Sequence, residues 1–172
     1  MAGIIEDFAK VLEEENECYE GLETLAKYTE MAVVEKQIDF LEKVVQTEEQ
    51  FIGRLNILGK KRDVLFKDIA LVTGLSPDGL TVTDVIEKIG PETEMGEKLT
   101  EIRNEMKEHA ENIRKKSELN KQLLSDSLDM VNFNLNAINT SRDNSYLVGY
   151  TNPTKANQPT HEIPASSFNF NQ

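Results

Sequence analysis

The chain is poor in the residues that carry most enzyme chemistry, with one cysteine and two histidines among 172 residues. The lone Cys18 excludes an intrachain disulfide and favours a reducing compartment. His161 lies in a polar C-terminal segment, and His109 has one carboxylate, Glu105, a helical turn before it. A di-iron bundle needs Glu-x-x-His pairs on two helices, and no Gly-rich phosphate-binding motif is present. We therefore predict a protein that is not an enzyme and binds no metal or cofactor.

Positive charge and long apolar runs are also scarce. The net charge of −12 argues against binding nucleic acid or an anionic membrane surface. No stretch reaches the roughly 20 apolar residues of a membrane span, and the N-terminus lacks a signal-peptide pattern. We expect a cytoplasmic protein with no nucleic-acid partner and no membrane insertion. Residues 1–30 hold nine acidic residues against two lysines, which is typical of a solvated helix face or, alternatively, of an electrostatic handle for a basic partner.

Helix-breaking residues are few before residue 140, and apolar residues recur there at alternating spacings of three and four. This period predicts helices over residues 3–33 and 38–73, joined by a weakly marked turn over residues 33–39. Two polar residues, Glu48 and Arg62, interrupt the apolar seam of the second helix. We expect their long side chains to extend to water at the edge of the bundle.

A cluster of capping signals follows the second helix. Gly74 ends that helix, and a turn leads to a short helix predicted over residues 82–89. Thr81 is expected to cap it together with Asp84, and Gly90 is expected to stop it.

The last helix is predicted over residues 91–140, with Pro91 in its first turn. Beyond Ile113, Lys116 and Asn120 fall on the apolar seam and the phase slips. Residues 131–138 alternate with period two, a strand signal, although the longer spacing favours helix. The apolar surface of this segment is wider than one neighbouring helix can cover. A new stripe consists of Leu124, Leu128, Val131, Leu135 and Ile138, flanked by Leu119, Leu123, Met130 and Phe133.

From about residue 140 the chain is rich in Asn, Pro, Ser and Thr. Such a segment cannot bury enough apolar area to offset its chain entropy. We predict an all-α protein with an elongated antiparallel bundle of three long helices plus one short helix, packed like a coiled coil, over residues 1–140. A disordered Asn/Pro-rich tail is predicted over residues 141–172.

Three stretches carry a likeness to a known family. They are residues 47–52 (TEEQFI), leading to Leu58 and Arg62; residues 69–74, followed by residues 80–82 (LTV); and residues 119–128 (LNKQLLSDSL), continuing to Leu135 and Asn136. With the order of the four helices, these stretches resemble the FlgN family of flagellar export chaperones. The resemblance covers most of residues 4–140.

The resemblance implies a cytoplasmic chaperone of flagellar type III export. Such a protein binds hook–filament junction (hook-associated) proteins through their terminal helical segments, prevents their premature assembly and delivers them to the export apparatus. It also implies contact with the export gate or the export ATPase complex, for which Tyr146 and Tyr150 are the nearest candidates. The client-binding part of the family corresponds here to Leu119, Leu123, Leu124, Ser127, Leu128, Val131, Leu135 and Ile138.

A second interpretation uses the same apolar stripe. A structural coiled-coil protein would bury it against a second copy of the chain and form a homodimer. A client-binding stripe predicts weak self-association and a stoichiometric complex with the client, whereas a self-pairing stripe predicts a stable dimer alone.

Overall fold

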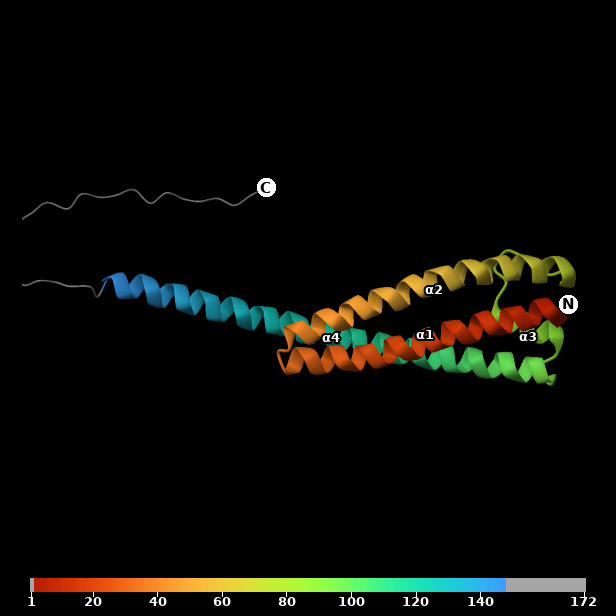
Figure 1. The fold of residues 1–172 in the computed structure, drawn as a ribbon, viewed down its shortest axis with the longest axis horizontal. Coiled ribbons are helices and arrows are strands. Elements are labelled where there is room, and N and C mark those ends of the chain that lie inside the picture. Colours follow the sequence, from red (N-terminus) through yellow and green to blue (C-terminus); the bar gives the residue numbers. More distant parts are fainter. Residues whose placement is uncertain (1, 148–172) are drawn as a thin grey trace, which may run out of the picture. The chain divides into compact units, whose positions relative to one another are not determined.

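The described part of the chain forms four helices, labelled in Figure 1. The computed structural model describes the backbone of residues 2–147 and the side chains of residues 3–140. The helices are α1 (Ala2–Val34), α2 (Ile38–Thr73), α3 (Val82–Ile89) and α4 (Glu94–Leu147). The all-α bundle of three long helices and a short one is confirmed, and the alternation over residues 131–138 does not produce a strand. The chain forms two compact units, Met1–Met130 and Val131–Gln172.

Side-chain contacts fix the direction of the three long helices within the first unit. Glu15 of α1 contacts Arg62 of α2, and Thr29 contacts Glu48, so α2 runs antiparallel to α1. In contrast, His109 of α4 contacts Glu23 at a separation of 86 residues. Lys116 contacts Glu30 at the same separation of 86 residues, so α4 runs parallel to α1.

The apolar core is concentrated at the end of the bundle that α3 covers. Phe8 and Leu12 of α1, Val85 of α3 and Leu99 of α4 are fully buried there, and Phe8 packs against the ring of Phe66. A smaller cluster of Val11, Cys18 and Leu58 follows along the bundle. Towards the other end of α1 the buried seam mixes apolar residues with small and polar ones, namely Leu25, Ala26, Thr29, Ala32 and Val33 of α1, Val44 of α2 and Asn120 of α4.

Local signals explain the ends of the short helix. The hydroxyl of Thr81 accepts a hydrogen bond from the amide of Asp84, whose carboxylate accepts one from the Thr81 amide in return. The Thr81 hydroxyl also lies 2.6 Å from the Asp84 carboxylate, and this hydrogen bond, with the one from the Thr81 amide, holds the pKa of Asp84 below its ordinary value. Gly90 ends α3 with a φ of 95°, a backbone conformation that favours glycine. The predicted span and cap of this helix are confirmed.

The ends of α4 differ from the prediction. The helix begins at Glu94 rather than at Pro91, because Thr93 caps it by accepting a hydrogen bond from the amide of Gly96 at 3.0 Å. Pro91 lies in the preceding turn. The helix continues to Leu147 instead of ending near residue 140. The division into a domain over residues 1–140 and a tail over residues 141–172 stays a prediction, and residues 148–172 lie outside the described part.

The acidic residues of α1 are used within the bundle more than the sequence indicates. The sequence predicted that these residues form either a solvated face or an electrostatic handle for a basic partner. Neither prediction includes ion pairs between the helices, which the structure shows. Those pairs join Glu13 to Lys98, Glu14 and Glu17 to Arg54, Glu15 to Arg62 and Glu30 to Lys116. The Arg62 side chain keeps 32% of its surface exposed, as expected, but its guanidinium also donates to the buried carboxylate of Glu15 at 2.7 Å, a partner that the sequence did not indicate.

Candidate functional site

The side chains of α4 change from buried to exposed just after Asn120. Asn120 is buried, Leu123 is half-buried, and every side chain described from Leu124 onwards is exposed. Up to this level the α4 seam is occupied, since Lys116 pairs with Glu30 and Asn120 donates to the carbonyl of Ala26. The predicted slip of phase is therefore a change from apolar to polar seam residues, and the seam itself continues through Asn120.

The predicted partner-binding residues of the first unit lie around this point and beyond it. Leu119 and Leu124 are exposed, Leu123 is half-buried, and Ser127 is exposed. Leu128 is 63% exposed. The neighbouring Met130 is exposed as well. A row of apolar side chains of this kind marks an interaction surface.

The second unit carries the rest of the predicted stripe. Val131, Leu135 and Ile138 are 54%, 52% and 50% exposed, and Phe133 is 72% exposed. Their spacing of four and three places the first three on one face of the helix. None of these side chains is buried within its unit. Ala137 takes part in a further interaction.

The two aromatic candidates for an export-gate contact are not placed. Tyr146 belongs to the last turn of α4, but its side chain lies outside the described residues, as does the whole of Tyr150. Their assignment stays a prediction.

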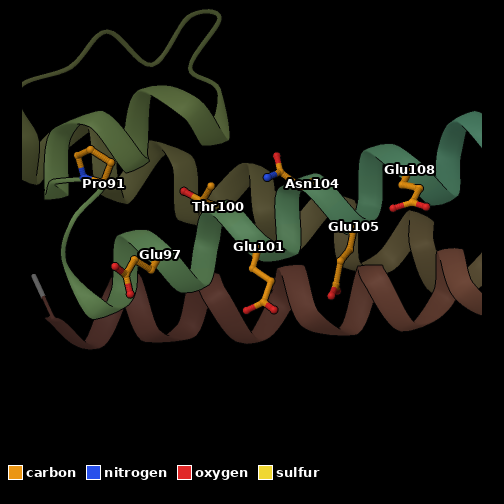
Figure 2. A pocket seen from close by; sticks show the side chains of 7 residues that line it. All are labelled: Pro91, Glu97, Thr100, Glu101, Asn104, Glu105 and Glu108. Carbon is orange, nitrogen blue, oxygen red and sulfur yellow. The ribbon is translucent and has the colours of Figure 1, made fainter.

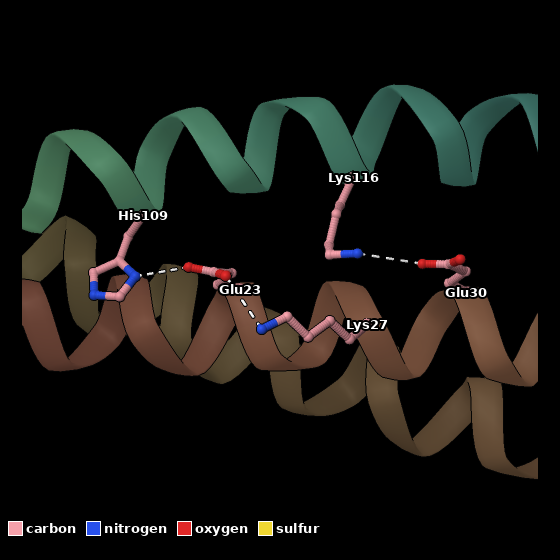
Figure 3. A network of polar contacts seen from close by, with 5 residues as sticks. All are labelled: Glu23, Lys27, Glu30, His109 and Lys116. Atoms are coloured by element: carbon pink, nitrogen blue, oxygen red, sulfur yellow. Dashed lines mark hydrogen bonds and ion pairs between the residues drawn. The ribbon is translucent and has the colours of Figure 1, made fainter.

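His109 has a structural partner. Its Nδ1 lies 2.7 Å from Oε2 of Glu23, and Lys27 contacts the same carboxylate at 3.2 Å (Figure 3). The hydrogen bond with His109 is the main cause that lowers the pKa of Glu23, and the Lys27 contact acts in the same direction. The interpretation of His109 as a satisfied, half-buried seam residue is confirmed.

The most acidic surface of the bundle lies on α4 near its start. A hollow there is lined by Glu97, Glu101, Glu105 and Glu108 together with Pro91, Thr100 and Asn104 (Figure 2). Oε2 of Glu105 accepts a hydrogen bond from the amide of Asn16 at 2.7 Å. Among the described residues, no group of three or more His, Cys, Asp or Glu side chains is placed to hold a metal ion. The acidic side chains therefore form a negatively charged outer face of α4.

Sequence reasoning missed a second hollow, which lies in the first unit. Its lining includes Glu48 of α2, Thr29 of α1 and Asn120 of α4, with Leu124 and Leu128 of the stripe. The signal was available, because Thr29, Glu48 and Asn120 all occupy seam positions of their helices. The sequence does not show how the three helices are aligned along the bundle, and this alignment brings the three polar seam residues together.

Fold and surface together define a class. It is an all-α bundle of long helices with a well-packed end and, on α4, a row of exposed apolar side chains. None of the described helices is long and apolar enough to cross a bilayer.

The FlgN family model matches residues 1–158, and the chain belongs to this family. No curated protein and no solved structure matches the chain. The family is one of flagellar export chaperones, and it is not known for enzymatic activity. The resemblance stated from the sequence is confirmed.

Proposed function

We propose that the protein is a cytoplasmic chaperone for flagellar hook–filament junction (hook-associated) proteins. It binds a terminal helical segment of the client along the apolar side chains at the C-terminal part of α4. This prevents premature assembly, and the chaperone then delivers the client to the export gate or to the export ATPase complex. The exposure of Leu128 and its neighbours on a helix whose earlier seam is buried carries this proposal.

The physical reason is the cost of leaving apolar side chains in water. An amphipathic client helix that packs on Leu124 and Leu128, and on the stripe of the second unit, removes this apolar area from solvent. An ordinary interface buries about 800 Å² on each partner. Membership of the FlgN family supports a flagellar export client as the partner.

The test compares two glutamate substitutions at apolar residues of similar exposure. Leu128→Glu changes the stripe, and Ile57→Glu changes a residue of α2 that is 59% exposed against 63% for Leu128. With a purified hook-associated protein, we expect Leu128→Glu to weaken the complex at least 100-fold and Ile57→Glu to leave it unchanged. Both should keep the helix content, since neither side chain is buried.

A second pair of measurements separates the homodimer. Light scattering of the chain alone should give a monomer at micromolar concentration and a 1:1 complex with the client. A stable dimer that Leu128→Glu dissociates, with no client complex, would favour the structural coiled coil instead. Unchanged client binding by both Leu128→Glu and Leu135→Glu would refute the assignment of the binding surface.

A further inference from the structure

The hollow beside the stripe combines apolar and polar walls. It has a volume of about 440 Å³ and lies wholly within the first unit, where α1, α2 and α4 meet. Leu124 and Leu128 form part of its lining, so a helix seated on the stripe covers it. The remaining lining residues are Ala26, Thr29, Glu48, Ser117, Asn120, Lys121 and Ser125.

Asn120 lines this hollow and carries a buried hydrogen-bond acceptor with no partner. The side chain is only 6% exposed, and its amide nitrogen donates to the carbonyl oxygen of Ala26 at 2.8 Å. Only the nitrogen can donate, so this bond fixes the orientation of the amide. The other atom, Oδ1, is buried and accepts no hydrogen bond from the described residues. Buried polar atoms are nearly always paired in folded proteins, so an unpaired one calls for a ligand or partner.

Glu48 brings a second acceptor. It is half-buried, and it forms no ion pair with any cation of the described residues, unlike Glu15 or Glu30. Its one donor is the hydroxyl of Thr29 at 3.4 Å, and that hydroxyl lies closer, at 3.1 Å, to the carbonyl of Leu25. A hydroxyl has one hydrogen to donate, so the carboxylate is left short of donors. Burial raises the pKa of Glu48.

We propose that this hollow receives one cationic side chain, an arginine or a lysine, carried on the apolar face of the client helix, with the Glu48 carboxylate and Oδ1 of Asn120 as its acceptors. The inference rests on the proposed function and adds to it a chemical requirement on the client. Arginine and lysine carry donors only, so they match a pair of unsatisfied acceptors. The flanking Leu124 and Leu128 match the apolar neighbours of such a residue on an amphipathic helix.

The charge of the protein agrees with a cation as the occupant. The net charge is −12, which favours a basic partner segment and disfavours a second copy of this chain. Lys121, exposed at the rim, is the cation of the hollow itself, and it forms no ion pair with Glu48. One ionic contact within an otherwise apolar interface specifies the register of the bound helix, as polar seam residues do in coiled coils.

Two nearly isosteric substitutions test the acceptors in the full chain. Glu48→Gln removes the charge, and Asn120→Leu removes the unpaired oxygen. We expect each to weaken binding of a purified hook-associated protein about tenfold or more. Glu48→Gln should not lower the melting temperature of the free chain, because the carboxylate has no strong internal partner. Asn120→Leu also removes the donor to the Ala26 carbonyl, so its melting temperature is compared with that of Asn16→Leu, which removes the donor to Glu105. Matched controls are Glu49→Gln, an exposed neighbour on α2, and Asn16→Leu, at the other buried amide with an unpaired oxygen; both should bind as the wild type does.

Substitutions in the client identify the cation. Each arginine and lysine of its terminal helical segment is changed to methionine in turn. One of these changes should weaken binding about as much as Glu48→Gln does, and combining the two should cost no more than either alone.

The outcomes distinguish this inference from the proposed function. If the wild type forms no complex with any hook-associated protein, the proposed function fails, and the inference with it. If binding depends on Leu128 while Glu48→Gln and Asn120→Leu bind as the wild type does, only the inference is overturned. A lower melting temperature or a changed oligomeric state of the free Glu48→Gln chain would overturn it too. The lower melting temperature would assign the hollow to contacts within this chain, and the changed oligomeric state would assign it to a second copy of the chain.

Discussion

The buried ion pair between α1 and α2 gives the sharpest prediction about stability. The Glu15 side chain is 2% exposed, and its Oε2 lies 2.7 Å from a guanidinium nitrogen of Arg62. Burial raises the pKa of Glu15, while the attraction of Arg62 and its hydrogen bond lower it. Burial is the larger effect, so the pKa lies above the ordinary value of 4.5. Arg62→Met removes the compensating charge, keeps much of the side-chain volume and leaves the carboxylate buried alone.

The expected loss follows from the geometry. Breaking a buried pair by removing one partner costs about 3–5 kcal/mol. The Arg62 side chain is 32% exposed, so water reaches the site and we expect a smaller loss, about 2–3 kcal/mol, at pH 8. A raised pKa means that the folded state holds the proton more tightly than the unfolded state does. Stability is therefore lost as the pH rises above 4.5 towards the folded pKa, and the loss in Arg62→Met should be smaller at pH 5 than at pH 8.

Urea unfolding followed by circular dichroism at 222 nm at the two pH values measures this difference. The double variant Glu15→Gln with Arg62→Met has no buried charge, so it should recover to within about 1 kcal/mol of the wild type at pH 8. Lys98→Met breaks an exposed pair with Glu13 and should cost less than about 1 kcal/mol at either pH. An equal loss for Arg62→Met at pH 5 and pH 8, or no recovery in the double variant, would refute the reasoning.

Two further predictions concern the backbone of α1, α2 and their turn. A Cβ at Gly21 would lie 2.6 Å from the ring of Phe51, whereas one at Gly53 would meet nothing within 4 Å. Gly21→Ala should therefore lower the free energy of unfolding by about 1–3 kcal/mol. Gly53→Ala should raise it by about 0.5–1 kcal/mol, because alanine favours a helix more than glycine does. Similar effects of the two changes would contradict the close packing at Gly21. Lys36 has a φ of 58° in the turn between the helices. Lys36→Gly should raise the melting temperature by a few degrees, since that conformation costs a lysine about 1 kcal/mol, and a lower melting temperature would contradict the turn geometry.

Elements with local signals could be predicted well. The short α3 is defined by Thr81, Asp84 and Gly90, each acting within four residues along the chain, and its bounds agree with the sequence. The start of α4 was placed too early because proline suits a first helical turn, whereas Thr93 has the stronger local bonds, to Gly90 and Gly96. Competing caps a few residues apart are hard to rank without their hydrogen bonds.

Contacts between helices could be predicted only in part. The apolar period indicated which faces are buried, and Glu48, Arg62 and Asn120 were recognised as seam residues. Their partners depend on how the helices are aligned along the bundle. The periodicity of one helix does not contain that alignment, because every heptad offers an equivalent position. The Glu15–Arg62 pair and the hollow at Asn120 were therefore beyond the reach of sequence reasoning.

The two ends of the bundle differ in how completely they are packed, and this difference bears on function. Around Phe8 and Leu99 large apolar side chains fill the space between all four helices, so that end is stable without a partner. Along the later part of the seam the buried apolar residues Leu25, Val33 and Val44 alternate with small and polar ones, including Asn120 with its unpaired oxygen. Leu128 of α4 is exposed. Under the proposed function, a folded anchor at one end allows the other to keep apolar and polar groups unsatisfied, and a client helix that supplied both kinds of contact would gain binding energy that the free chain does not use.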